Sequence, residues 1–328
     1  MSRRTRVFLA VAGAILAIGL GVGFVASLLG GTLTFGDGDA PAEFAYVPVD
    51  TRFIAYADVR GIMDSELRRR LSGPATGSGD ATRRFRDETG IDLEQDIDHV
   101  IAAWSGQDVS DPPIVLMRGT LDQDRIEALV RSQGGVVEEY GGRTLVRHGE
   151  RLAVAFVEPG LVAVGSLDAL RRAIDVGTGS ADARDNDELM SLVRQVRGGH
   201  VWLVARFDEL TEGRIPPDLA GQLPAITWIS LTGFVDAGVQ GRLSVEARDE
   251  MAAQDLREVI RGFLALARMN AGDRAVVGDL IDSLQLTGQG TTVALSFAIP
   301  PEVIDLLGAI RDLQPDSFDS FDPPFPGL

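Results

Sequence analysis

Three histidines, one serine and several acidic residues are the side chains of this sequence that could perform chemistry, but their spacing favours no known reaction. His99, His148 and His200 lie far apart, and none has a second histidine at the short spacing of a metal-binding pair. We interpret His148 as a turn residue and His99 and His200 as residues that begin strands. Ser105 is followed by glycine, yet the Gly-x-Ser-x-Gly pattern of a hydrolase nucleophile is missing.

Four acids alternate as in the first half of a calcium-binding loop: Asp92, Glu94, Asp96 and Asp98. The sixth position is Ile97 instead of glycine, and the twelfth is Ala103 instead of glutamate, so a solvated connection is the better interpretation. Carboxylate pairs such as Glu138/Glu139 and Asp208/Glu209 are expected by chance among 48 acids. We therefore predict no catalytic residue, no cofactor-binding residue and no metal site, and we expect that the protein is not an enzyme.

Composition excludes further classes. The chain has no cysteine and no lysine, which rules out disulfides, thiolate metal sites, a phosphate-loop lysine and a Schiff-base lysine. Its net charge of −17 opposes binding to phosphate backbones, so no nucleic-acid partner is expected. One basic run is either a solvated helix face or a patch for an anion or an acidic partner: Arg68, Arg69 and Arg70, with Arg83, Arg84 and Arg86.

Val7–Leu29 predicts a membrane anchor, because its 23 residues carry no charge. A helix of that length spans roughly 35 Å at about 1.5 Å per residue, enough to cross a hydrocarbon core of about 30 Å. Arg3, Arg4 and Arg6 precede the span and should stay in the cytoplasm. We predict a single-pass protein of the cytoplasmic membrane, embedded in the lipid bilayer through Val7–Leu29, with the body outside the cytoplasm.

A cleaved secretory signal is the alternative to a retained anchor. Such signals have an apolar core of about 7–15 residues and a small-x-small cleavage site. The apolar stretch here is longer, and the best site, after Ser27, has Val25 at the position that requires a small residue. Gly19 and Gly23 form a Gly-xxx-Gly pair, which permits helix pairing in the membrane but is also common without it. The sequence therefore leaves the oligomeric state open.

The exported part predicts an α+β fold: an N-terminal transmembrane helix followed by two similar antiparallel-sheet-plus-helix units. We divide the chain into the cytoplasmic tip and anchor 1–29, the tether 30–43, the first unit 44–176, a linker with a connecting helix 177–198, the second unit 199–313, and a disordered acidic and aromatic tail 314–328. The tail has Phe318, Phe321 and Phe325 between aspartates and prolines, so a docking segment is the alternative.

Both units place their elements in one order. Each begins with a strand and a short helix, continues with a strand pair that leads into an amphipathic helix, and ends with a hairpin that leads into a helix. The first unit adds a meander over 136–164, with tight turns at glycine pairs such as Gly141-Gly142. We predict an internal duplication, and the sequence leaves open whether the units form one sheet or two.

Glu250–Met269 is the strongest helix pattern. Leu256, Val259, Ile260 and Phe263 recur on one face, which we expect to be core. On that expectation, truncating Phe263 to alanine would cost roughly 3–5 kcal/mol.

Two segments carry a recognisable pattern: Pro48, Asp50, Asp58 and Ser65, followed by Gly90, Ile91 and Asp92. In these segments the chain resembles uncharacterised bacterial envelope proteins that have one N-terminal span and a mixed exported body. The resemblance covers about 60 residues, implies export and an α+β fold, and brings no catalytic residue with it.

The leading functional hypothesis is a membrane-anchored extracytoplasmic module of the bacterial cell envelope that binds or scaffolds an envelope protein without catalysis. One alternative is a carrier of a lipid or another apolar ligand, which requires an apolar cavity. The other is an envelope hydrolase with a carboxylate site, which requires a carboxylate with a raised pKa.

Overall fold

The computed structural model describes residues 40–71, 86–87, 90–92, 94–105, 113–132, 134–148, 152–207, 226–271, 278, 281–301 and 303–304. The predicted anchor Val7–Leu29 and tail 314–328 lie outside these ranges, as do most of the predicted tether and of the last predicted helix, Pro301–Leu313. Within the described ranges, no helix combines the length and apolar character needed to cross a membrane.

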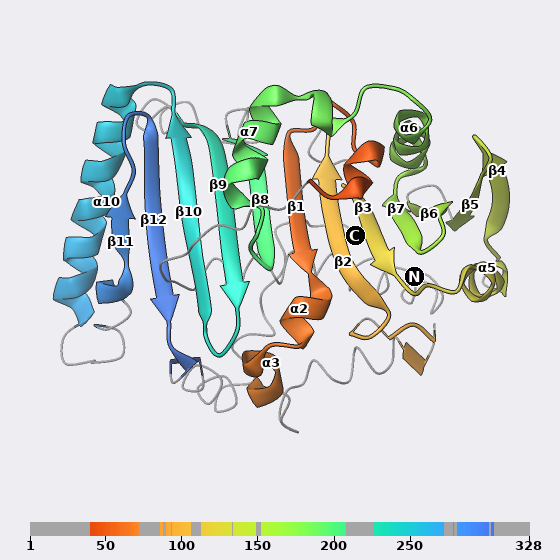
Figure 1. Ribbon diagram of the computed structural model, residues 1–328, viewed down its shortest axis with the longest axis horizontal. Coiled ribbons are helices and arrows are strands. Elements are labelled where there is room, and N and C mark those ends of the chain that lie inside the picture. The colour runs from red at the N-terminus through yellow and green to blue at the C-terminus, as the bar shows by residue number, and fades with distance from the viewer. Residues whose placement is uncertain are drawn as a thin grey trace.

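The described strands form one antiparallel sheet, and with its helices this confirms the α+β class (Figure 1). In chain order they are β1 (Phe53–Asp58), β2 (Ile97–Trp104), β3 (Ile114–Gly119), β4 (Val136–Tyr140), β5 (Arg143–His148), β6 (Leu152–Glu158), β7 (Leu161–Gly165), β8 (Val201–Arg206), β9 (Ile226–Val235), β10 (Val239–Ala247), β11 (Gln285–Thr287) and β12 (Thr292–Ile299). Their order across the sheet is β11-β12-β10-β9-β8-β1-β2-β3-β7-β6-β5-β4. The two predicted units therefore share a continuous sheet, joined at its centre where β1 pairs with β8.

Strand order is the same in the two halves of the sheet. From the centre outward, one half reads β1-β2-β3-β7-β6 and the other reads β8-β9-β10-β12-β11. The first half continues with β5 and β4, which form the hairpin that the Gly141-Gly142 turn predicts; both glycines have positive φ, 55° and 72°. This shared order is what a duplication would leave behind, and the duplication itself stays a prediction that superposing the halves would test.

The described helices pack on both sheet faces. They are η1 (Ala42–Tyr46), α2 (Val59–Met63), α3 (Glu66–Leu71), α5 (Gln123–Ser132), α6 (Leu167–Gly177), η2 (Ala183–Asp185), α7 (Asp187–Val196) and α10 (Glu250–Ala271). We call the side covered by η1, α6 and α7 the η1 face and the side covered by α2, α5 and α10 the α5 face. Strand register supports this assignment, because β12 residues that contact α10 lie on the same side as β2 residues that contact α5.

The short helix predicted after the first strand, at about residues 60–71, is two helices instead of one. Asp58 caps α2 by accepting a hydrogen bond from the Gly61 amide at 2.8 Å. The Ser65 hydroxyl accepts from the Arg68 amide at 3.1 Å and so starts α3 anew. A second cap within the apolar pattern therefore interrupts the helix that the pattern alone predicts.

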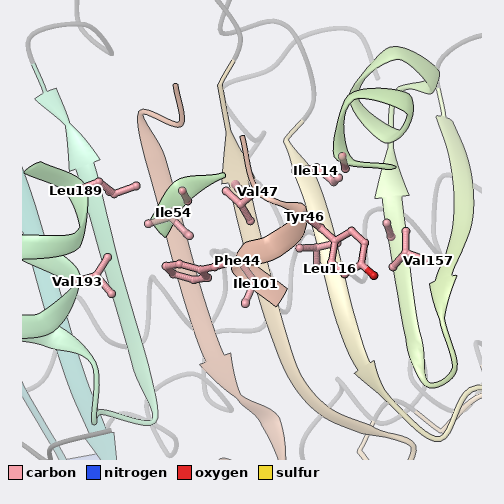
Figure 2. Close-up of a cluster of buried hydrophobic side chains, with 14 of the residues drawn as sticks. Phe44, Tyr46, Val47, Ile54, Ile101, Ile114, Leu116, Val157, Leu189 and Val193 are labelled. Carbon is pink, nitrogen blue, oxygen red and sulfur yellow. The ribbon is translucent and has the colours of Figure 1, made fainter. Parts of the chain in front are cut away.

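The largest core cluster lies under the η1 face (Figure 2). Phe44 of η1, Val47 directly after it, Ile54 of β1 and Ile101 of β2 are fully buried there. Leu189, on α7, packs into the same cluster and extends it to the other half of the sheet. Ser166 caps α6, since its hydroxyl accepts from the Ala169 amide at 3.2 Å.

Candidate functional site

Three of the four acids in the run before and within β2 form ion pairs with arginines. Asp92 pairs with Arg86 at 2.9 Å and Glu94 with Arg68 at 2.5 Å, and Asp98 pairs with Arg60. Part of the predicted basic run therefore forms structural ion pairs. Among the described residues, no group of three histidine, aspartate or glutamate side chains could hold a metal ion.

The other residues considered for chemistry lie apart. His200 immediately precedes β8 instead of lying within it, and its Nδ1 accepts a hydrogen bond from the Val235 amide at 3.0 Å. His148 ends β5, and Ser105 follows β2 as a half-buried residue. Glu138 lies 3.8 Å from Arg147. Arg83, Arg84, Asp208 and Glu209 lie outside the described residues.

Glu43 of η1 is the centre of a buried polar cluster that the sequence did not reveal. Its Oε1 accepts from Nε of Arg118 at 2.7 Å, and Nε2 of His99 lies 3.2 Å from the same oxygen without the alignment of a hydrogen bond. Nη2 of Arg118 also donates to Glu158 at 2.5 Å. Burial opposes ionisation of Glu43, but His99 and Arg118 together outweigh it and lower its pKa from 4.5 to about 2.

This cluster fastens η1 to the sheet. The Tyr56 ring stacks on Trp202 at 5.4 Å and lies 5.4 Å from the His99 ring, and burial raises the Tyr56 pKa to about 12. A carboxylate with a pKa near 2 and a phenol with a pKa near 12 exchange no proton at neutral pH, so neither suits acid–base catalysis. The arrangement therefore supports an anchoring role.

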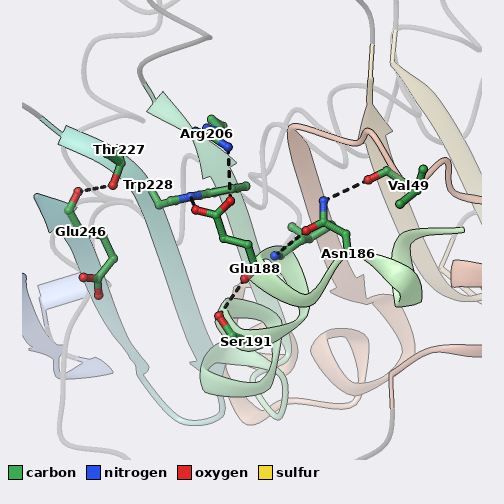
Figure 3. A network of polar contacts seen from close by, with 9 residues as sticks. Val49, Asn186, Glu188, Ser191, Arg206, Thr227, Trp228 and Glu246 are labelled. Atoms are coloured by element: carbon green, nitrogen blue, oxygen red, sulfur yellow. Dashed lines mark hydrogen bonds and ion pairs between the residues drawn. The ribbon is translucent and has the colours of Figure 1, made fainter. Parts of the chain in front are cut away.

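A second polar network joins α7 to β8 and β9 (Figure 3). Glu188 accepts a hydrogen bond from the Trp228 indole at 2.7 Å and lies 3.3 Å from Nη1 of Arg206. The Arg206 guanidinium also lies over the Trp228 ring at 5.3 Å. Each of these charged or polar groups has a partner within the network. The network therefore has a structural role, because it holds α7 against β8 and β9.

The exposed face of α10 is the surface that stands out, and it corrects the prediction for Phe263. Phe263 is 69% exposed instead of buried, and Val259 is 47% exposed. The stripe that contacts the sheet is narrower: Ala253 is fully buried, with Leu256 and Ile260 packed beside it. A Phe263→Ala cost of 3–5 kcal/mol therefore no longer follows, because no large cavity would form.

The apolar residues of α10 cover two adjacent strips, and only one of them faces the sheet. Five of the six large hydrophobic side chains that are exposed in the described ranges lie on this helix: Met251, Val259, Phe263, Leu266 and Met269. At 100° per residue, Val259, Phe263 and Leu266 fall within about 60° of one another, beside the strip that holds Ala253 and Ile260. A hydrophobic pattern reveals that a face is apolar but not what covers it.

The exposed strip has the alternating three- and four-residue spacing of a helix-pairing surface. We call the exposed strip the α10 seam: Asp255, Val259, Gly262, Leu266 and Met269 at that spacing, together with Phe263 beside them. Open space surrounds the position where Gly262 would carry a side chain, so another backbone can approach closely at mid-helix. The arginines lie elsewhere: Arg257 donates to the carbonyl of Gly290 at 2.8 Å, and Arg268 to Asp282 at 3.1 Å.

Comparison with known proteins yields only distant likenesses. No protein-family model matches the chain, and no curated protein matches it. Three solved crystal forms of TP0453 are similar at 14% identity, each covering 84% of this chain: form III with a TM-score of 0.47 and 100% of that chain covered, form IV with 0.45 and 97%, and form I with 0.42 and 99%. No named family confirms the resemblance to bacterial envelope proteins, which stays a prediction.

Proposed function

We propose that the protein is a non-catalytic binding module, held in the cytoplasmic membrane by Val7–Leu29, whose exported body binds a helical segment of an envelope protein along the α10 seam. One observation carries this proposal: the exposed large hydrophobic side chains of the described body are concentrated on a single helix. Contiguous exposed apolar surface of this kind is typical of sites of association.

The spacing and charge of α10 favour a protein helix over a lipid surface. Helices that lie in membrane interfaces have a polar face rich in basic residues. Here Glu250, Asp255 and Glu258 balance Arg257, Arg261 and Arg268, and the body as a whole is acidic. Asp255 lies within the seam itself, where it would oppose insertion into lipid but can pair with a donor on another helix.

The hydrolase alternative lacks its required carboxylate among the described residues. Glu43 and Asp182 are the described carboxylates whose pKa departs clearly from the usual value, and both pKa values are lowered. A general acid at neutral pH needs a raised value. The absence of a catalytic role accordingly remains part of the proposal.

Photo-crosslinking in intact membranes tests the proposed surface. A photoreactive amino acid at Phe263 of the full-length chain should give one discrete protein adduct, whose site on the partner mass spectrometry would locate in a helical segment. The same group at Gln254, which is exposed on α10 about 180° from Phe263, should give none. Val259→Asp, introduced beside the Phe263 probe, should abolish the adduct because it places a charge in the seam.

The outcomes separate the alternatives. Adducts to lipid instead of protein would contradict the proposal and favour the carrier hypothesis. Equal labelling from Phe263 and Gln254, or no adduct from either, would show that the seam has no specific partner.

The proposed topology has its own test. A reporter that functions only in the cytoplasm, fused after Leu328, should be inactive, and the mature protein should retain Val7–Leu29. Strong reporter activity would contradict an external body, and a mature chain that starts near Leu28 would contradict the anchor.

A further inference from the structure

Arg242 lies in the middle of β10 on the η1 face, at a place where the sheet is polar. Strand register puts it directly opposite Thr232 of β9 on one side and Ser296 of β12 on the other. Ser244, two residues along β10, points to the same side and is opposite Ser230. The Cβ atoms of residues opposite each other on neighbouring strands lie about 5 Å apart, so these hydroxyl groups flank the Arg242 side chain.

The polar groups of this cluster are largely unpaired. Arg242 is half-buried and makes no hydrogen bond or ion pair within the described part of the chain. Ser230 is 5% exposed and Ser296 is 9% exposed, and the side chains of these serines likewise have no partner among the described residues. Thr232 differs, because its hydroxyl donates to the Val196 carbonyl at 2.9 Å.

Some partly buried arginines of the body have carboxylate partners. Arg118 contacts Glu43 and Glu158, and Arg206 contacts Glu188. The acid of β10 on the same face, Glu246, lies four residues from Arg242, about 13 Å along the strand, and accepts from the hydroxyl of Thr292 at 2.8 Å. Within the described ranges, Arg242 is therefore a cation without a counter-ion, although the chain has a large excess of acids.

No described helix covers this part of the η1 face. Helix α7 packs on β8 and β9, whereas α10 contacts β10, β11 and β12 from the α5 face. Figure 1 accordingly shows β10 and β12 with no described helix in front of them. The guanidinium group is thus within reach of a ligand that approaches the sheet from the η1 face.

We infer that Arg242 and its surrounding hydroxyl groups form a binding site for a carboxylate group of a ligand. A guanidinium group presents two parallel N–H donors that match the two oxygens of a carboxylate, and the serine hydroxyls can donate to the remaining lone pairs. One arginine balances one negative charge, so a singly charged carboxylate fits better than a doubly charged phosphate group in so acidic a body. The site is distinct from the α10 seam, which lies on the opposite face of the sheet.

Thermal unfolding of the full-length chain in nanodiscs, followed by tryptophan fluorescence, tests this site. Replacing chloride by acetate at equal ionic strength should raise the unfolding midpoint of the wild type by about 2 °C or more. Arg242→Gln should lose this rise. Arg261→Gln removes an exposed arginine of α10 on the other face and should retain it.

Two further measurements keep the inference falsifiable even if Arg242→Gln fails to fold. Ser244→Leu keeps the arginine but places a bulky apolar group beside it, and the acetate-dependent rise should disappear. Phosphate at the same ionic strength should stabilise less than acetate. A rise that persists in Ser244→Leu or Arg242→Gln, no rise in the wild type, or an equal effect of phosphate would overturn the carboxylate site.

Discussion

The two halves of the sheet follow the same strand order but differ in how their faces are covered. In the first half, η1 and α6 pack on one face while α2 and α5 pack on the other. In the second half, α7 covers only the strands nearest the centre on the η1 face, and α10 covers the outer strands on the α5 face. The exposed apolar helix and the unpaired Arg242 both belong to this second half.

This difference is the basis of the two proposed binding surfaces. In the first half, ionised groups such as Glu43 and Arg118 pair with one another and hold elements in place. In the second half, apolar side chains of α10 face solvent, and Arg242 lacks a carboxylate partner among the described residues. If the proposals hold, the first half chiefly provides stability and the second half provides the binding surfaces.

The largest expected effect is in the core of the first half. Phe44→Ala should lower the free energy of unfolding by about 3–5 kcal/mol, because Phe44 is fully buried against Trp202 and its removal leaves a cavity. Urea unfolding of the full-length chain in nanodiscs, followed by tryptophan fluorescence, measures this change. If the urea midpoint of Phe44→Ala equalled that of the wild type, the first half would not be the more tightly packed half.

The next effect depends on pH. The folded pKa of Glu43, about 2, is below its usual value of 4.5, so its stabilising contribution is complete above pH 4.5 and is lost as the pH falls from 4.5 to 2. The shift corresponds to about 3 kcal/mol. Glu43→Gln should therefore flatten the acid limb of the stability curve, whereas Glu139→Gln, at an exposed position, should leave it unchanged. An unaltered acid limb in Glu43→Gln would contradict the role assigned to the cluster.

A smaller loss of stability is expected in the polar network that connects α7 to β8 and β9. Glu188→Ala should cost about 1–2 kcal/mol, since it leaves the indole N–H of the buried Trp228 without its acceptor. Glu258→Ala, on the exposed side of α10, is the matched control and should change stability by less than about 0.5 kcal/mol. Equal costs for the two variants would show that the network contributes nothing.

The smallest stability effect should come from the residue with the largest proposed role in binding. Phe263→Ala should change the free energy of unfolding by no more than about 0.5 kcal/mol, because the ring is 69% exposed. The same substitution should weaken the adduct formed by a photoreactive group at Leu266. A loss of several kcal/mol would instead mean that α10 is core and that the halves do not differ as described.

Local patterns predicted the elements well, since the signals that define them are short. The glycine pair at 141–142 predicted its hairpin, because turn geometry is decided within a few residues. The break between α2 and α3 was missed, because Ser65 lies within an apolar pattern that suits a continuous helix.

Contacts between distant segments could not be predicted in the same way. Glu43 lies in a segment predicted as tether, and nothing near it in sequence indicates Arg118, 75 residues away. Phe263 and Ile260 have the same apolar character, so only the placement of α10 on the sheet separates an exposed side chain from a packed one. The cluster around Arg242 likewise depends on strand register, which the sequence did not specify.

The pairing of β1 with β8 also affects the order in which the protein can fold. Ala55 of β1 pairs with Ala102 of β2 on one side and with Leu203 of β8 on the other. β1 is therefore synthesised well before β8, its partner from the second half. Until β8 arrives, β1 presents an unpaired edge through which another nascent chain could associate. Pairing of β1 with β8, which are far apart in sequence, is therefore expected to be a late and slow step of folding. Cleavage of the chain between the two halves would expose an unpaired strand edge on each half wherever the halves separate.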